Sequence, residues 1–259
     1  MTRNASRTAA GHLIRLRRIL HPKTGRTLII PLDHAAADGL LPGLSDSRKI
    51  IADAAKAGAD AVMLRPGLMD AFVETDSRAL GVILMLTGRL SRGLDHVLLN
   101  TVEHAVRCGA DAVCAEFKLG SAGDLENARM ASAVAEAARQ FGLPVLMTSY
   151  ALREQVDKLG PSAYAQACRI CEELGADMIK TSLPADPEII ASCLAAVRIP
   201  IVLAGGAGGQ SRDLLDHIAA AVKLGVAGAA IGRNVWQHED PVGIARRLRQ
   251  IVHGAAEVG

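Results

Sequence analysis

Lys56-Ala57-Gly58-Ala59-Asp60-Ala61-Val62-Met63 is the stretch that decides the fold, because variants of it recur along the chain. The pattern of a glycine, an aspartate two residues later and a short apolar run returns at 107–114 and 173–180, and more loosely at 223–230. A glycine just after the last helical residue takes the left-handed conformation without a Cβ penalty, and a continuous apolar run is typical of a buried strand. Each copy therefore predicts the end of a helix and the beginning of a strand.

Apolar runs and helical stretches alternate along the whole chain. Strands are expected at 27–33, 60–65, 81–87, 111–117, 144–149, 177–182, 199–204 and 228–232, and helices at 46–57, 68–77, 95–108, 124–141, 161–174, 186–196, 211–224 and 241–252. This alternation predicts an α/β protein, a closed parallel (β/α)8 barrel. A doubly wound open sheet is the alternative, because periodicity does not show closure.

The 259 residues are expected to form one domain behind a short helix. No Ser/Gly-rich linker or charge block divides the chain. We expect an N-terminal extension with a short amphipathic helix at 1–26, closing the lower end of the barrel, and the barrel domain at 27–259. The first 32 residues are also rich in arginine and free of acidic residues, so an organelle transit peptide is a second interpretation of this segment.

The composition narrows the class of protein. Apolar residues make up 50% of the chain and charged residues 22%, which is typical of a globular protein and not of a disordered one. The net charge of +2 and the scarcity of aromatic residues, 2% of the chain, argue against nucleic-acid binding. No apolar run reaches the roughly 18 residues of a membrane span. The five scattered cysteines fit a reducing compartment, so we expect a cytoplasmic protein.

Lys180 is the most informative residue at the predicted strand ends, where barrel enzymes carry their catalytic groups. It interrupts an otherwise apolar run in a chain that is poor in lysine. A buried, uncharged amine is what Schiff-base chemistry on a carbonyl substrate requires, whereas a strand-end lysine can also reach to solvent. Lys118 is the rival nucleophile, and its place just past a predicted strand suggests that it is exposed.

Groups for proton transfer end two other predicted strands. Asp33 follows the apolar run 28–32, and Tyr150 follows 145–149. Either side chain suits proton transfer to and from a substrate hydroxyl, and either also suits a structural turn. His96 and Glu116, together with other histidines and carboxylates, match no metal-ligand spacing. Neither a metal nor another cofactor is therefore expected.

Glycine-rich turns follow the last two predicted strands, at 204–209 and at 231–234. Loops in these positions hold phosphate in many barrels, because backbone N–H groups at glycine approach an anion closely. Arg233 would add a charge-assisted contact, while the alternative is the ordinary use of glycine in tight turns. The turns match neither the dinucleotide fingerprint nor the P-loop. The expected partner is a phosphorylated small molecule.

Four segments in this order resemble one enzyme family: 27–34, 176–181, 200–206 and 232–237. They are similar to the class I aldolases of archaeal fructose-bisphosphate aldolase type, which include aminodideoxyheptulosonate synthases and autoinducer-phosphate thiolases. The likeness runs from about residue 14 to residue 241, nearly the whole chain.

The resemblance implies a TIM barrel, a homo-oligomer and a metal-free reaction. It places the Schiff-base lysine at Lys180, an acid/base aspartate at Asp33 and a tyrosine proton donor at Tyr150. The residues that would bind phosphate or substrate are Gly205, Gly206, Gly232, Arg233, His34 and Lys118. The implied activity is cleavage or formation of a C–C bond in a phosphorylated keto sugar.

Three departures from the family pattern leave the substrate open. Ala35 stands where the family has glycine, residues 150–153 replace a Tyr-Pro-Arg-Gly turn, and Leu183 replaces an aromatic residue. The last two border the expected substrate space. A transaldolase-like synthase, a thiolase-type acyl transferase and a non-catalytic sugar-phosphate-binding barrel are therefore alternative functions on the same scaffold.

Overall fold

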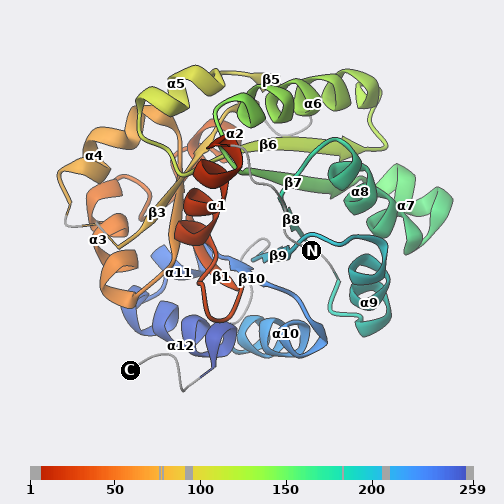
Figure 1. The fold of residues 1–259 in the computed structure, drawn as a ribbon. Helices are drawn as coiled ribbons and strands as arrows, with labels where there is room; N and C mark the ends of the chain where they lie inside the picture. Colours follow the sequence, from red (N-terminus) through yellow and green to blue (C-terminus); the bar gives the residue numbers. More distant parts are fainter. Residues whose placement is uncertain are drawn as a thin grey trace.

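Eight parallel strands close into a barrel in the computed structural model, which describes residues 7–75, 77, 79–90, 96–182, 184–205 and 211–254 (Figure 1). The barrel strands are β1 Thr27–Pro31, β2 Ala61–Leu64, β3 Gly81–Met85, β6 Ala112–Leu119, β7 Val145–Ala151, β8 Met178–Thr181, β9 Ile201–Ala204 and β10 Gly228–Ala230. They follow one another around the barrel in chain order, and β10 pairs with β1 to close it. The predicted closed barrel is confirmed, and the open sheet is excluded.

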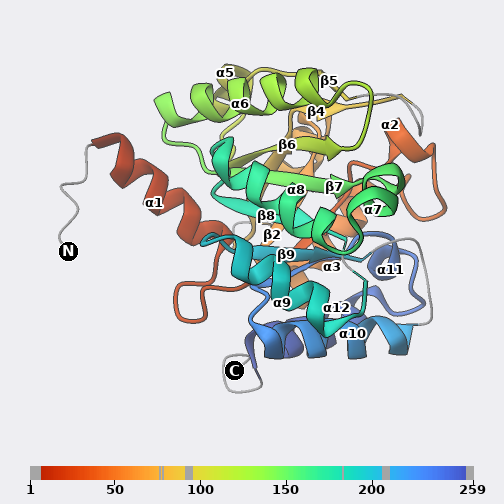
Figure 2. The same ribbon diagram turned by 90° about the vertical axis from the view of Figure 1, so that its right-hand side faces the viewer.

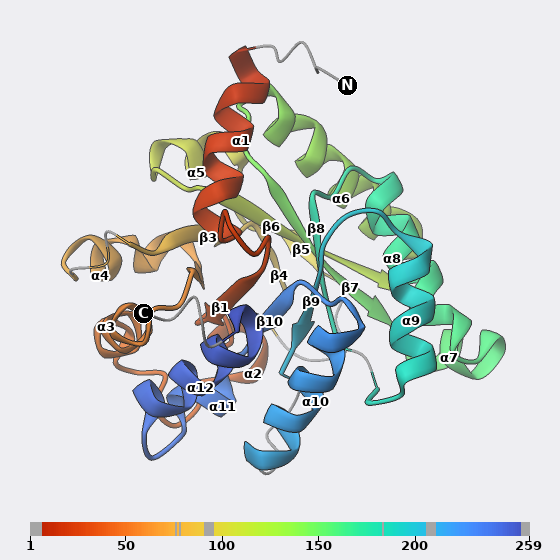
Figure 3. The same cartoon turned by 60° about the horizontal axis from the view of Figure 1, so that its bottom comes forward.

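Helices surround this barrel, with the strands inside the ring (Figure 3). They are α3 Ser47–Ala57, the turn η1 Pro66–Leu68 with α4 Met69–Val73, α5 Val102–Arg107, α6 Asp124–Gln140, α7 Arg153–Leu159, α8 Ser162–Glu173, α9 Pro187–Ala196, α10 Ser211–Leu224 and α12 Pro241–His253. Alternate strand residues face either these helices or the barrel interior, so the core divides into a large outer cluster and a smaller inner one.

The N-terminal helix α1, Arg7–Ile19, covers the end of the barrel at which the strands begin (Figure 2). Its last residue, Ile19, is fully buried among the interior side chains, and Leu16 and Leu20 pack beside it. The short helices α2 Ala35–Asp38 and α11 Arg233–Trp236 lie at the opposite end. The predicted helix at the lower end is confirmed.

The recurring aspartates form hydrogen bonds to neighbouring strands at the lower end of the barrel. Asp60 Oδ2 accepts a hydrogen bond from the backbone N–H of Leu28 at 2.7 Å. Asp111 does the same for Val82 at 3.0 Å, and residue 177 repeats the contact on the neighbouring strand. Each of the three repeats with an aspartate therefore ends a helix, begins a strand and also forms a hydrogen bond to the strand before it.

Two segments differ from the prediction. The helix expected at 95–108 begins only at Val102, where the Thr101 side chain accepts from the N–H of His104 at 3.2 Å. Before it, β5 Val97–Leu98 pairs antiparallel with β4 Thr87–Gly88, because this short apolar run adds to a strand end instead of winding into the helix. Helix α7 was not expected, since Gly160 breaks the helical pattern just after it.

Among the described residues, none of the helices has the length and apolar character needed to cross a membrane.

Candidate active site

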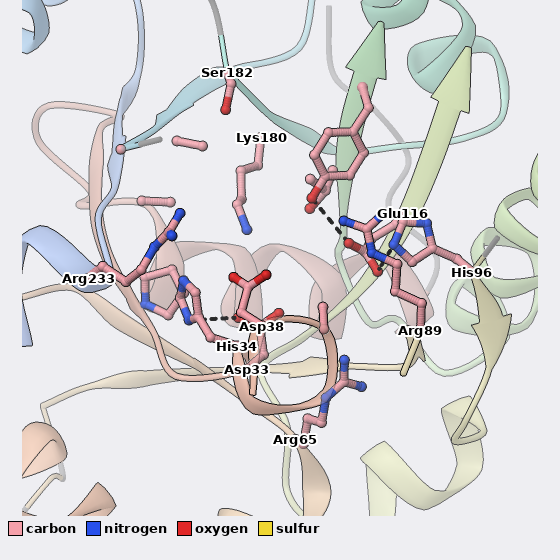
Figure 4. Close-up of a pocket in the computed structure, with 18 residues that line it drawn as sticks. Asp33, His34, Asp38, Arg65, Arg89, His96, Glu116, Lys180, Ser182 and Arg233 are labelled. Atoms are coloured by element: carbon pink, nitrogen blue, oxygen red, sulfur yellow. Dashed lines mark hydrogen bonds and ion pairs between the residues drawn. The ribbon is translucent and has the colours of Figure 1, made fainter. Parts of the chain in front are cut away.

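A cavity of about 280 Å³ opens at the end of the barrel where the strands finish. Figure 4 shows side chains from several strand ends pointing into it. Its polar and glycine lining consists of Asp33, His34, Asp38, Arg65, Arg89, His96, Glu116, Thr148, Tyr150, Lys180, Ser182, Gly205, Gly232 and Arg233. The structure thus brings together the predicted residues Lys180, Asp33, Tyr150 and His34 with Arg233 and two of the predicted glycines.

Lys180 lies in β8, between Thr148 of β7 and Val202 of β9 in the register of the sheet. Its half-buried side chain points into the middle of the cavity (Figure 4). Within the part of the chain that the structure describes, its amine forms neither an ion pair nor a hydrogen bond. The amine is therefore open to a carbonyl compound in the cavity.

Lys118, the rival nucleophile, is placed differently. Strand β6 runs on to Leu119, so Lys118 is part of the strand, opposite Tyr150 of β7, and only 4% of it is exposed. The expectation of an exposed lysine past its strand is wrong. Lys118 is not among the residues that line the cavity, and its contact with a substrate stays a prediction.

Tyr150 is held by a buried carboxylate that the sequence did not reveal as part of the site. Its hydroxyl donates to Glu116 Oε1 at 3.2 Å. The other carboxylate oxygen of Glu116 lies 3.0 Å from His96 Nε2 and accepts from the Thr87 hydroxyl at 3.3 Å. Glu116 stands near the end of the predicted strand 111–117, where catalytic groups are expected, and was also considered as a metal ligand. Its contacts with Tyr150 and His96 were not predicted, because these residues are distant in the chain.

The protonation of this pair follows from its surroundings. Burial opposes the charge on Glu116, but the hydrogen bonds from His96 and Tyr150 and the charge of Lys180 outweigh it, and the pKa of Glu116 lies below its usual value. Burial and the Glu116 and Asp33 carboxylates raise the pKa of Tyr150 well above its usual value. At neutral pH the carboxylate is therefore charged and the phenol is protonated.

Asp33 and His34 approach the cavity from the end of β1. Asp33 Oδ1 lies 4.0 Å from His34 Nδ1, and the imidazole packs edge-on against Trp236 with ring centroids 5.5 Å apart. Burial lowers the pKa of His34, Asp33 counteracts this, and the charges of Lys180 and Arg233 add to the lowering. The imidazole is neutral at pH 7 as a result.

The glycine turns after β9 and β10 meet beside the cavity. Asn234 Nδ2 donates to the Gly205 carbonyl at 3.1 Å and so joins the two turns. A Cβ atom at Gly232 would lie 2.6 Å from His34 Cε1 and 2.9 Å from the Pro31 carbonyl oxygen, which leaves room only for glycine. The predicted Gly206 and the departure at 183 lie outside the described residues.

Two arginines add positive charge on the side of the cavity away from Arg233 (Figure 4). Arg65 Nη1 donates to the Thr87 carbonyl at 3.0 Å. The Nε atoms of Arg65 and Arg89 are buried, and among the described residues neither has a hydrogen-bond partner. Arg65 is the last residue of the strand predicted at 60–65, whereas Arg89 follows the short β4 strand that the sequence pattern did not predict. The cavity suits an anionic ligand.

Comparisons with known proteins agree with this geometry. The family model of the DeoC/LacD aldolases matches residues 27–238. This chain belongs to the DeoC/LacD aldolase family. The predicted family resemblance is thereby confirmed, and so is the predicted enzyme class, a carbon–carbon lyase of the aldolase type.

The relatives within the DeoC/LacD family include synthases and aldolases. A 2-amino-3,7-dideoxy-D-threo-hept-6-ulosonate synthase from Halobacterium salinarum is 34% identical over 96% of this chain and 94% of its own length. A fructose-bisphosphate aldolase class 1 from the same species is 30% identical over 91% of this chain and 94% of its own. A crystal structure of an archaeal fructose 1,6-bisphosphate aldolase superposes with a TM-score of 0.84 at 28% identity, covering 94% of this chain and 100% of that one.

Proposed function

We propose that this DeoC/LacD aldolase is a class I enzyme in which Lys180 forms an imine with a phosphorylated keto sugar. The observation that carries the proposal is the Lys180 amine, which lies in the cavity between groups suited to proton transfer and has no ion-pair partner among the described residues. One archaeal fructose-1,6-bisphosphate aldolase of solved structure, 27% identical with a TM-score of 0.84, has its catalytic lysine covalently bound to the carbinolamine intermediate of its substrate.

The side chains around Lys180 divide the proton transfers between them. The amine adds to the substrate carbonyl, and the protonated phenol of Tyr150 donates to the departing hydroxyl, which leaves as water. Asp33 takes the proton of the substrate hydroxyl while the C–C bond breaks and its electrons pass to the iminium, giving an enamine. The aldehyde fragment leaves as the first product, and the proton on Asp33 passes to the enamine carbon. Water then adds to the resulting iminium and releases the second product and the free amine.

The phosphate of the substrate is assigned to the glycine turns. Gly206 and Gly232 would offer backbone N–H groups, Gly205, whose own N–H donates to the Ala230 carbonyl, would let the phosphate approach the turn closely, and Arg233 would offer a guanidinium. The close approach of Gly232 to His34 supports this, because any side chain at residue 232 would fill the turn. His34 and Lys118 are proposed as further substrate contacts.

A synthase is the second candidate. The Halobacterium synthase and a 2-amino-4,5-dihydroxy-6-oxo-7-(phosphonooxy)heptanoate synthase from Streptomyces griseus, 31% identical over 95% of this chain and 92% of its own, favour it. Such an enzyme would keep the imine at Lys180 and pass the enamine to a second carbonyl compound. Dependence of turnover on an acceptor aldehyde would distinguish this synthase from a lyase.

The experiment that tests the proposal is borohydride inactivation in the presence of a chelator. The wild-type enzyme is incubated with each of a panel of ketose phosphates and then reduced with borohydride. We expect irreversible inactivation that requires both ketose and borohydride and that chelator does not prevent. Loss of activity in chelator alone, or a protein that binds the ketoses without turnover or reduction, would contradict the proposal and favour a metal-dependent enzyme or a binding protein.

We propose in addition that the enzyme works in the cytoplasm as a homo-oligomer. The scattered cysteines support the location, and the family resemblance supports the assembly. Sedimentation of the purified chain and cell fractionation test these two statements.

A further inference from the structure

A buried carboxylate, Glu116, lies beside Tyr150 in the lining of the cavity. Glu116 is 7% exposed, and each of its carboxylate oxygens has a side-chain partner: Tyr150 on Oε1 and His96 and Thr87 on Oε2. Placing an ionised carboxylate in such surroundings costs several kcal/mol unless it is paired. The hydrogen bonds therefore show what holds this carboxylate in place, and the phenol is the one partner that the proposed chemistry uses.

The same elements fix the orientation of the phenol ring. The imidazole of His96 stacks on the ring of Tyr150, with centroids 6.1 Å apart and planes 17° from parallel. Glu116 lies in β6, which pairs with the β7 strand that carries Tyr150, and its own N–H donates to the Thr87 hydroxyl at 3.0 Å. The phenol is thus held at its hydroxyl by Glu116 and along its face by His96.

We propose that Glu116 and His96 are positioning residues for Tyr150: Glu116 accepts the hydrogen bond of the phenol and so keeps its oxygen at the cavity, from which the O–H turns to the substrate, and His96 holds Glu116. This inference rests on the proposed function, in which Tyr150 donates the proton that turns the carbinolamine hydroxyl into water. A phenol ring that turns freely would lie within hydrogen-bond distance of that hydroxyl in only a small fraction of its conformations, whereas a fixed ring stays at that distance.

The charge of Glu116 also disfavours the loss of the phenol proton of Tyr150. A phenolate beside a carboxylate is destabilised, so the phenol readily takes its proton back from the water that adds to the iminium later in the cycle. The charged or titratable groups that act electrostatically on Glu116 or Tyr150 are Lys180, Asp33, Arg89, His96 and Cys114. Of these five, His96 contacts Glu116 directly, at the carboxylate oxygen that Tyr150 does not use.

A double-mutant cycle tests the proposal kinetically. Glu116→Gln keeps the shape of the side chain but removes the charge, and we expect kcat to fall by about 10- to 100-fold with KM changed less than about threefold. In a Tyr150→Phe background the same substitution should change kcat by less than about twofold, because the group that it positions is gone. His96→Asn should show a smaller loss with the same dependence on Tyr150. Losses that multiply independently in the double variant would overturn the proposal.

Titration of the phenol gives a readout that does not depend on activity. The chain has two tyrosines, so in a Tyr164→Phe background the phenolate absorbance reports Tyr150 alone. We expect Glu116→Gln to lower the pH midpoint of this titration, and the surface variant Glu126→Gln to leave it unchanged. An unchanged midpoint in Glu116→Gln would overturn the inference even if Lys180 forms an imine. A shifted midpoint in an enzyme that forms no imine would show instead that only the proposed function has failed.

Discussion

The two ends of the barrel both carry buried or half-buried carboxylates, but the carboxylates have different partners. At the lower end Asp60, Asp111 and Asp177 each accept a backbone N–H from the neighbouring strand. Each is also paired with a basic side chain from outside the barrel: His253 at 2.9 Å, Arg18 at 3.0 Å and His12 at 3.3 Å, respectively. These carboxylates are part of the framework.

At the upper end the carboxylates face side chains and the cavity. Glu116 accepts from Tyr150 and Thr87 and contacts His96, and Asp33 Oδ1 lies 4.0 Å from the imidazole of His34. The lower carboxylates hold neighbouring strands together through backbone N–H groups, whereas the upper ones contact side chains that line the cavity. Substitutions at the two ends should therefore separate stability from activity.

The largest effect is expected at Lys180. Lys180→Met removes the only proposed imine-forming atom, so kcat should fall by at least about three orders of magnitude while the free energy of unfolding changes little. The matched control is Lys223→Met, an exposed lysine at the end of α10, which should retain activity. Turnover by the Lys180→Met enzyme within tenfold of wild type, in a steady-state cleavage assay, would contradict the assignment.

A substitution at the lower end of the barrel should reduce stability and leave activity unchanged. Asp60→Ala leaves the Leu28 N–H and the buried His253 without their common partner, and we expect a loss of about 3 kcal/mol in the free energy of unfolding. Because this site is at the opposite end of the strands, kcat per folded molecule should stay near the wild-type value. Urea denaturation and active-site titration measure the two quantities. An Asp60→Ala variant that is as stable as wild type but inactive would contradict the assignment of Asp60 to the framework.

Gly232→Ala tests the upper end through its backbone. The added Cβ would meet His34 and the Pro31 carbonyl, so the turn must shift and the phosphate contact with it. We expect KM for a ketose phosphate to rise about tenfold. The same kinetics on a ketose without phosphate serve as the control, and an equal rise for both would argue against phosphate binding at this turn.

The smallest effect is a difference in pH dependence. The pKa of Glu116 is lowered from 4.5, so its contribution to stability is complete above pH 4.5 and is lost as the pH falls through the lowered pKa. Burial raises the pKa of Asp111 above 3.8, so its contribution is complete below pH 3.8 and is lost as the pH rises through the raised pKa.

The two carboxylates should consequently behave oppositely in acid. On lowering the pH, the stability gap between wild type and Glu116→Gln should narrow, whereas wild type should gain relative to Asp111→Asn. Chemical denaturation at a series of pH values measures both gaps. Gaps that move in the same direction would show that the two sites are not electrostatically distinct.

The sequence predicts features that depend on neighbouring residues and misses those that join distant ones. Gly58 and the apolar run after it determine a helix end and a strand locally, so the barrel is predictable. Lys180 is conspicuous because it interrupts such a run. The contact of Glu116 with His96 joins β6 to the β4–β5 hairpin, and the expected helix at 95–108 concealed that hairpin. No local pattern could therefore place Glu116, His96 and Arg89 around one cavity.

The most direct measurement of the central claim is the location of the reduced adduct. The wild-type enzyme is treated with a ketose phosphate and borohydride, digested, and mapped by tandem mass spectrometry. We predict a single adduct, equal in mass to the ketose phosphate joined through a reduced imine, on the peptide that contains Lys180 and on the amine of that residue. An adduct on Lys118 with Lys180 unmodified, or complete turnover without any adduct, would contradict the account.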